Sequence, residues 1–433
     1  MGQKEINDTV CALATPAGGA LGIIRVSGPE AISIADKLFR PVKGKPLTEA
    51  KPYTVHFGQI VIDGRLIDEV LATVFRAPHS YTGEDSVEFS CHGSPYILQC
   101  VLEALVDNGC TLAKPGEYTQ RAFLNGKMDL SQAEAVADLI ASQTAATHRI
   151  ALQQMRGGYS QKLNSLRNKL LEMASLLELE LDFSEEDVEF AERRQLAGLM
   201  EEIKQEITRL TSSFRLGNAL KNGVPVAIIG APNVGKSTLL NRFLREDRAI
   251  VSDIQGTTRD AIEDTMTLQG VLFRFIDTAG IRHTDDTIEK LGIERSIRAA
   301  EKAQIILLIT EPGVPYPDIS IRADQTVIRI VNKTETFQAL TGKGTDELER
   351  QLLASVPSAE TDELLVTNIR HYEALTLALG DISRAFTSLQ DGLPGDLIAE
   401  DLRLCLAHLG EILGEITSAE ILANIFSHFC VGK

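Results

Sequence analysis

The segment GAPNVGKST at 230–238 constrains the fold of this chain more than any other feature. It follows the apolar run VPVAII at 224–229 and precedes LLNRFL, so the pattern predicts a turn between a buried strand and a helix. A GxxxxGK[ST] turn in that position binds phosphate through backbone N–H groups and the helix N-terminus, while Lys236 reaches the β- and γ-phosphate oxygens and Ser237 binds Mg²⁺. The alternative is a glycine-rich turn without a ligand, and companion motifs decide between the two.

Two companion motifs follow at suitable distances. DTAG at 277–280 comes directly after the predicted strand VLFRFI, which places Asp277 at a strand end on the Mg²⁺ side. SDIQGTTRD at 252–260 lies between this motif and the phosphate loop and offers Thr258 as a second Mg²⁺ ligand. These motifs make a ligand-free turn the weaker interpretation and predict an inserted nucleotide-hydrolysing α/β domain.

A base-reading motif favours guanine. NKTE at 332–335 follows the predicted strand TVIRIV and resembles NKxD, so Asn332 and Lys333 are candidate base contacts, whereas Glu335 is one methylene longer than the usual Asp. ALTGKGTDEL at 339–348 resembles the next base-contact loop, but three residues cannot hold the helix and strand that normally intervene. We therefore expect the natural chain to hold further residues around 335–339 and around 311–324. An intact mass equal to that of the printed sequence would contradict this.

The γ-phosphate side lacks the glutamine that orients water in small signalling GTPases, because Ile281 follows DTAG. Glu289, in IEKLGIE, is a candidate acid for positioning the water. A solvated carboxylate on a helix face is the alternative, and the residues alone leave both open.

The remaining sequence predicts a multidomain α/β and α protein. Residues 1–118 alternate short β-like runs with helices around 29–39 and 95–108, which indicates an α+β domain. Residues 119–219 and 360–433 show helical periodicity and predict a discontinuous helical bundle. The mostly parallel, Ras-like α/β domain at 220–359 is inserted into it.

Composition excludes some classes. The net charge of −17, from 43 basic and 60 acidic residues, disfavours a globally basic nucleic-acid binder but not a local basic surface. If 139–171 formed one uninterrupted helix, Arg149, Arg156 and Arg167 would share a face, unless Gly157 and Gly158 break it. The cysteines form no CxxC pair and no run approaches the roughly 20 apolar residues of a membrane span, so a reducing cytoplasm is expected.

Two further positions stand out in the terminal segments. Arg25 lies in the otherwise apolar GIIRVSG and needs an acidic partner, which Glu88 could provide. The two could form a structural ion pair or bind a pterin amino group, and both interpretations stay open. Cys430 in FCVGK is either buried filling or a group for substrate chemistry, while the other five cysteines are predicted to be core.

Several segments together resemble the bacterial tRNA-modification GTPase family MnmE (TrmE), over essentially the whole chain. They are TPAGGALGIIRVSGP at 15–29, SYTGEDSVEFSCHGSP at 80–95, KPGEYTQRAFLNGKMDLSQAEAVADLI at 114–140, the GTPase motifs, and FCVGK at 429–433.

The resemblance implies GTP hydrolysis to GDP, with Lys236 and Glu289 in catalytic positions and Mg²⁺ on Ser237 and Thr258. It implies K⁺-dependent dimerisation of the GTPase domains, with K⁺ on Asn233, Ser252, Ile254 and Thr257. The implied nucleotide contacts are Asn233, Val234, Gly235, Lys236, Ser237, Thr238, Ser252, Asp253, Ile254, Gln255, Gly256, Thr257, Thr258, Asp277, Thr278, Ala279, Gly280, Asn332 and Lys333.

The resemblance also implies an N-terminal domain that dimerises and binds 5-formyltetrahydrofolate through Arg25, Glu88, Lys127 and Lys433, with Cys430 nearby. A homodimer would act with an FAD-containing MnmG/GidA-type protein, as a heterotetramer, to place an aminomethyl-type group on C5 of the wobble uridine of certain tRNAs. Two alternatives remain: a ribosome-assembly or signalling GTPase that shares only the central domain, and a folate-dependent one-carbon enzyme that acts on something other than tRNA.

Overall fold

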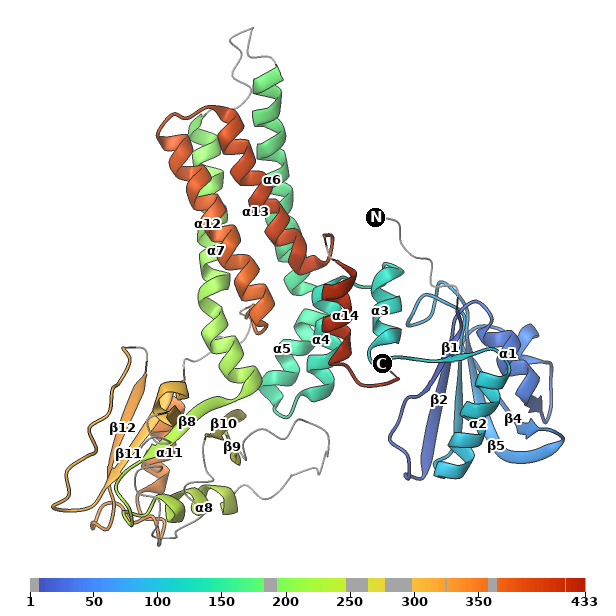
Figure 1. Ribbon diagram of the computed structural model, residues 1–433, viewed down its shortest axis with the longest axis horizontal. Helices are drawn as coiled ribbons and strands as arrows, with labels where there is room; N and C mark the ends of the chain where they lie inside the picture. The colour runs from blue at the N-terminus through green and yellow to red at the C-terminus, as the bar shows by residue number, and fades with distance from the viewer. Residues whose placement is uncertain are drawn as a thin grey trace. The chain divides into compact units, whose positions relative to one another are not determined.

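The computed structural model describes most of the chain, which divides into two compact units (Figure 1). The first unit comprises residues 1–140, 154–164 and 410–433, and the second comprises 141–153 and 165–409. The described residues are 8–182, 193–246, 264–276, 298–323, 325–356, 364–416 and 418–432. In this described part no helix is both long and apolar enough to cross a membrane.

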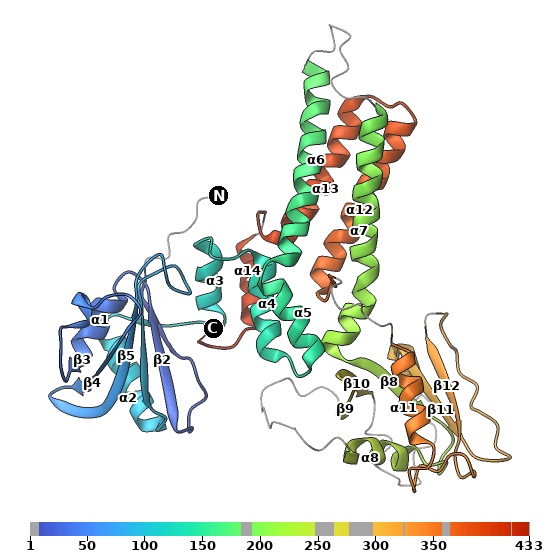
Figure 2. The ribbon, with the colours of Figure 1, turned by 180° about the vertical axis from the view of Figure 1, so that it is seen from behind.

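A seven-stranded sheet forms the centre of the first unit, in the order β3-β4-β5-β6-β2-β1-β7. Its strands are β1 (Val10–Leu13), β2 (Leu21–Ser27), β3 (Phe39–Pro41), β4 (Thr54–Ile62), β5 (Arg65–Phe75), β6 (Ser86–His92) and β7 (Thr111–Leu112). All neighbours are antiparallel except β1 and β7. The helices α1 (Ala31–Leu38) and α2 (Pro95–Asp107) share an apolar core with the sheet, as the alternation of buried residues along the strands requires (Figure 2). A 3₁₀ turn spans Leu47–Glu49.

Three helices and the chain's last residues complete this unit. They are α3 (Glu117–Leu124), α4 (Leu130–Ala141) and α14 (Ala419–Ser427), with a small core of Leu130, Ala133, Phe426 and Phe429. Ser418 caps α14 by accepting the N–H of Ile421. The N–H of Gly116, at the start of α3, donates to the carbonyl of Cys430. The end of the chain is therefore tied to a domain that begins more than 400 residues earlier.

The helical part of the second unit contains α5 (Ala145–Met155), α6 (Gly158–Asp182), which starts in the first unit, α7 (Arg193–Asn222), α12 (Ile369–Gln390) and α13 (Gly395–Leu413), which ends in the first unit. Phe214 of α7 stacks on Tyr372 of α12 with ring centroids 4.4 Å apart. Between α5 and α6 the chain turns at Gly157, whose φ is +84°. Since this break separates Arg149, Arg156 and Arg167, the face that one continuous helix would have given them does not exist.

The second sheet has the order β12-β11-β8-β10-β9, and only β9 is antiparallel to its neighbour. Its elements are β8 (Val224–Ile229), α8 (Lys236–Glu246), β9 (Asp264–Leu268), β10 (Val271–Phe275), β11 (Ile305–Thr310), β12 (Thr326–Val331) and α11 (Thr345–Ala354). β8 carries six nearly all-buried residues, as a central parallel strand should. The mostly parallel sheet, the N-terminal α+β unit and the helices confirm the predicted multidomain fold class.

No helix or strand lies between β12 and α11 in the described residues 325–356. Instead the chain turns sharply after β12, and Gln338 and Lys343 form an isolated bridge. Thr334 closes the turn by accepting the N–H of Phe337 at 3.0 Å. The contraction that the sequence indicated after Glu335 is thus present in the fold.

Candidate functional site

The phosphate loop connects β8 to α8, as predicted. Gly230 lies against β11, because a Cβ atom there would meet the carbonyl oxygen of Ile309 at 2.2 Å. Asn233 and Gly235 both have positive φ, +63° and +102°. This turn comes directly before α8, in which Ser237 and Thr238 follow Lys236, and a turn of this kind ahead of a helix can present successive N–H groups to a phosphate. The local geometry is that of a phosphate cradle.

Lys236 closes this loop on itself. Its Nζ donates to the carbonyl oxygens of Gly230 and Ala231, both at 2.8 Å. Burial lowers the pKa of Lys236, because taking the ammonium out of water disfavours its charged form. A phosphate group in the loop would offer this ammonium a charged acceptor in place of two neutral carbonyls.

Asn332 joins the phosphate loop to the base side of the site. It is 4% exposed, its Nδ2 donates to the carbonyl of Val234 at 2.8 Å, and its Oδ1 accepts the N–H of Ala339 at 2.9 Å. Val234 is itself buried, so this amide links two loops about 100 residues apart in the sequence. The structure therefore brings Asn332 to the predicted site, in a role that also organises the loop.

Lys333 lies beside the same loop. Its φ is +61°, its Nζ donates to the carbonyl of Asn233 at 3.3 Å, and it pairs with Glu311. Glu335 is exposed, in the turn that Thr334 closes. Base contact by Asn332 and Lys333, and not by Glu335, stays a prediction.

Other predicted residues of the nucleotide site lie outside the described residues. They are Ser252, Asp253, Ile254, Gln255, Gly256, Thr257, Thr258, Asp277, Thr278, Ala279, Gly280 and Glu289, and Lys433 of the predicted folate set is outside them as well.

Arg25 and Glu88 form a second site on the N-terminal sheet. They are directly opposite each other on β2 and β6, and Glu88 Oε1 accepts from Arg25 Nε at 2.8 Å and lies 2.7 Å from Nη2. Arg25 Nη1 donates to the carbonyl of Gly432, at the end of the chain, at 3.2 Å. Their side chains keep 16% and 26% of their surface exposed. The second oxygen of Glu88 receives no hydrogen bond from the described residues, so it can accept one from a ligand.

Two tyrosines that the sequence did not single out complete this site. The guanidinium carbon of Arg25 lies 5.7 Å from the ring centroid of Tyr81 and 5.4 Å from that of Tyr118, within the range of cation–π contacts. Tyr118 donates its hydroxyl to the carbonyl of Arg25 at 2.8 Å, and burial raises its pKa. Burial also raises the pKa of Tyr81, which pairs with Thr119. Both tyrosines belong to the segments SYTGED and PGEYTQ, which offered a signal.

Lys127 reaches the loop that carries Tyr81. Its Nζ donates to the carbonyl of Pro78 at 2.9 Å, and the stem of its side chain passes within 3.4 Å of where a Cβ on Gly83 would lie.

Cys430 is exposed, so the structure contradicts its interpretation as buried filling. Cys11, Cys91, Cys110 and Cys405 are buried as predicted, whereas Cys100 on α2 is only half-buried. The prediction that all five were core is thus wrong for Cys100.

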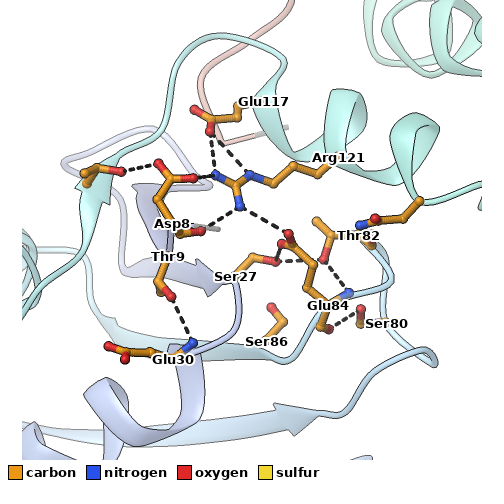
Figure 3. Close-up of polar contacts among 12 residues, drawn as sticks. Asp8, Thr9, Ser27, Glu30, Ser80, Thr82, Glu84, Ser86, Glu117 and Arg121 are labelled. Atoms are coloured by element: carbon orange, nitrogen blue, oxygen red, sulfur yellow. Dashed lines mark hydrogen bonds and ion pairs between the residues drawn. The ribbon is translucent and has the colours of Figure 1, made fainter. Parts of the chain in front are cut away.

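A fully buried arginine, Arg121, organises the loop and helix around this site (Figure 3). Its guanidinium bonds to Asp8 Oδ1 at 2.8 Å, to Glu117 Oε1 at 2.8 Å and to Glu84 Oε1 at 3.1 Å. Ser27 donates to the other oxygen of Glu84 at 2.8 Å. Since Glu84 follows Tyr81 and Glu117 precedes Tyr118, this network fixes both tyrosines relative to the sheet. Nothing in the sequence pattern pointed to Arg121.

The fold and the first site define a P-loop nucleotide-binding protein with a Ras-like nucleotide unit, and comparison with known proteins is more specific. Residues 9–127 match the family described as GTP-binding protein TrmE N-terminus, and residues 130–430 match the MnmE helical domain. The tRNA modification GTPase MnmE of Bacteroides fragilis strain YCH46 is 54% identical over 98% of this chain and 99% of its own length. The proteins of that name from Christiangramia forsetii and Flavobacterium johnsoniae are 48% and 47% identical. The chain belongs to the MnmE (TrmE) family.

The alignment with the Bacteroides fragilis protein spans 462 positions, whereas this chain has 433 residues. The relative therefore holds residues without a counterpart in this chain.

Proposed function

We propose that this protein is a GTPase that hydrolyses GTP to GDP and phosphate and takes part in tRNA modification. The observation that carries the proposal is similarity to curated tRNA modification GTPases along 98% of the chain, together with a phosphate loop that Asn332 joins to a base-side loop. A GTPase that shared only the central domain would have no reason to match along the N-terminal unit.

In the nucleotide site, positive charge and N–H groups placed around the phosphates would bind GTP and promote its hydrolysis. Lys236 exchanges its two carbonyl acceptors for β- and γ-phosphate oxygens, and the loop N–H groups bind the remaining oxygens. Ser237 and Asn233 offer the oxygen ligands that Mg²⁺ and K⁺ favour. With Thr258, Ser252, Ile254 and Thr257 they would hold these ions, which supply positive charge next to the phosphates. Glu289 would position the attacking water.

The N-terminal side binds a formylated tetrahydrofolate and mediates a homodimer. The second oxygen of Glu88 accepts a pterin amino group, Tyr81 offers an aromatic face, and Lys127 and Lys433 supply positive charge for the folate carboxylates. Together with an FAD-containing MnmG/GidA-type partner, in a heterotetramer in the cytoplasm, the protein would place an aminomethyl-type group on C5 of the wobble uridine. Cys430, exposed at the end of the chain, is available to this chemistry.

GTP turnover in K⁺ compared with Na⁺, at equal ionic strength, tests the nucleotide half of the proposal. We expect GTP turnover to be much faster in K⁺. The proposed ligands would hold K⁺ next to the phosphates, where its positive charge is needed, and would hold Na⁺ there less well. Equal rates would contradict the role of Asn233 and K⁺-dependent dimerisation.

Binding of 5-formyltetrahydrofolate, measured by calorimetry, tests the other half. A wild-type protein that binds GTP but no folate would favour the alternative of a GTPase without one-carbon chemistry. Fully modified wobble uridine in tRNA from a deletion strain would exclude tRNA as the substrate and leave a folate enzyme acting elsewhere.

A further inference from the structure

A basic surface lies at the edge of the N-terminal sheet, where α1 runs directly into β3. Between residues 37 and 51 the chain carries five basic side chains and one acidic side chain, Glu49, although the whole chain has a net charge of −17. β3 is an edge strand, and no described strand lies beyond it (Figure 2). The five basic residues are all exposed and are called the β3 basic surface below: Lys37, Arg40, Lys43, Lys45 and Lys51.

Hydrogen bonds anchor the backbone of this segment. Asp36 Oδ1, on α1, accepts the N–H of Leu47 at 2.6 Å, and Leu47 is fully buried. Arg76 Nη2 donates to the carbonyl of Thr48 at 2.7 Å, and its Nε donates to the carbonyl of Ala50 at 3.2 Å. The lysines between β3 and the 3₁₀ turn therefore belong to a loop that is fastened at both ends.

Arg40 is itself held in place and still has open donors. Its Nη1 donates to the carbonyls of Asp36 and Lys37 at 3.2 Å and of Phe39 at 3.1 Å. Positive charge is favourable there, because the last carbonyls of a helix carry partial negative charge. Neither Nε nor Nη2 of Arg40 bonds to any described residue, so this edge of the guanidinium can donate to two oxygens of one phosphate group.

Carboxylates neutralise little of this surface. Lys45 pairs with Glu49 at 2.8 Å, whereas the other four basic residues form no ion pair with a described carboxylate. A polyanion that binds several such cations releases its condensed counterions, so it gains affinity even on a chain that is acidic overall. An acidic protein would need carboxylates at matching positions, whereas every nucleotide of an RNA supplies a phosphate. The surface therefore fits an RNA backbone better than a protein.

We propose that the β3 basic surface binds the phosphate backbone of the tRNA. This inference rests on the proposed function in tRNA modification. Arg40 donates to one phosphate through Nε and Nη2, while Lys37 and Lys43 contact neighbouring phosphates. Backbone contacts supply affinity and orientation and carry no base information, so this surface does not choose between tRNA sequences.

Neutralising three of these residues tests the proposal. The combined variant is Lys37→Gln, Arg40→Gln and Lys43→Gln, and tRNA binding to the full chain is followed by fluorescence anisotropy from about 50 to about 200 mM salt. We expect affinity at the lowest salt to fall about 10- to 100-fold, and the slope of log affinity against log salt to become shallower by about two to three. GTP turnover and folate affinity should not change, because none of the contacts described for either site involves these residues.

A single variant covers the case in which replacing Arg40 disturbs the end of α1. Lys43→Gln removes one exposed charge from the loop and should make the salt slope shallower by about 0.7 to 0.9. The matched control removes three positive charges from exposed positions elsewhere and should bind tRNA as the wild type does. It combines Arg65→Gln, Arg194→Gln and Lys302→Gln.

The outcomes separate this surface from the proposed function. Wild-type tRNA affinity and salt slope in the combined variant would overturn the inference and leave the proposed function standing. An equal loss in the control would mean that net charge alone governs binding, and would overturn it too. A combined variant that keeps tRNA affinity but no longer binds the flavoprotein partner would overturn it in favour of a protein-binding surface. Fully modified wobble uridine in a deletion strain would overturn the proposed function itself.

Discussion

The two sites of this protein are built in opposite ways. The phosphate loop is one contiguous segment that would bind phosphate mainly through its backbone, and the side chain of Asn332 joins this loop to the turn that holds Ala339. The N-terminal site combines side chains from β2, β6, α3 and a loop with a carbonyl at residue 432. A site made by the backbone of one segment should tolerate substitutions in the residues around it. A site made of side chains from several elements depends on the contacts that hold those elements together. The effects of a single substitution should therefore extend further from the changed residue in the first unit than in the second.

The strongest test of this contrast is Arg121→Met. The change leaves Glu84 and Glu117, 13% and 14% exposed, without their cation, and removing one partner of a buried pair costs about 3–5 kcal/mol. We expect faster hydrogen exchange in peptides covering 114–125, and loss of folate binding. Exchange in β8 and α8 and GTP affinity should not change. A variant that keeps wild-type folate affinity would show that the tyrosines do not need this network.

Asn332→Ala should have a smaller and more local effect. It leaves the carbonyl of Val234 and the N–H of Ala339 without partners, at a cost of about 1–3 kcal/mol for each unsatisfied buried group. Relaxation of the two loops removes part of this cost. We expect GDP affinity, measured by calorimetry, to fall roughly 10- to 100-fold. Glu335→Gln is the matched control, because Glu335 is exposed, and it should bind GDP as the wild type does. A large loss in this control would make Glu335 the base reader after all.

The same contrast explains what could be predicted from the sequence. Motif spacing predicted that Lys236, Asn332 and Lys333 lie close together, and the structure places all three in or beside the phosphate loop, because such a loop and its companions keep a fixed order along the chain. It also paired Arg25 with Glu88, because an arginine in an apolar strand requires a partner. It did not find the residues whose contacts arise only when distant segments meet, which are Tyr81, Tyr118 and Arg121.

The end of a helix was also hard to predict from the sequence where it depends on the conformation of a single residue. Periodicity across 139–171 continues through Gly157, but a φ of +84° ends the helix there. The arginine face was a consequence of assuming one continuous helix. The three arginines therefore do not form one basic helix face for tRNA.

Glu88→Gln distinguishes a ligand-binding pair from a structural one. A glutamine keeps the shape but weakens the charge-assisted bond to Arg25 and the bond to a ligand amino group. We expect folate affinity to fall about 10-fold, as for loss of one charged hydrogen bond. The stability of the unit should change little, since both side chains are partly exposed. A loss of stability with unchanged folate affinity would mean that the pair is structural.

The smallest expected effect concerns Asp8 and pH. Burial works against the ionised form of Asp8, but the hydrogen bond and charge of Arg121 outweigh it, so its pKa lies below the usual value. A carboxylate with a depressed pKa stabilises the fold fully above its unfolded pKa of about 3.9, and this contribution is lost as pH falls through the lower folded value. The Asp8 side chain is 53% exposed, so solvent screening keeps the contribution below about 1 kcal/mol.

Comparison of Asp8→Asn with the wild type tests this. Urea unfolding, followed by hydrogen exchange in the 114–125 segment, should show a constant small deficit in the variant from pH 7 to about pH 5 that shrinks at more acidic pH. Asp36→Asn, which removes a carboxylate on α1 that Arg121 does not contact, should not reproduce this profile. A deficit that grows as pH falls would have the wrong sign for a depressed pKa, and would mean that burial outweighs Arg121 and raises the pKa of Asp8 in the folded protein.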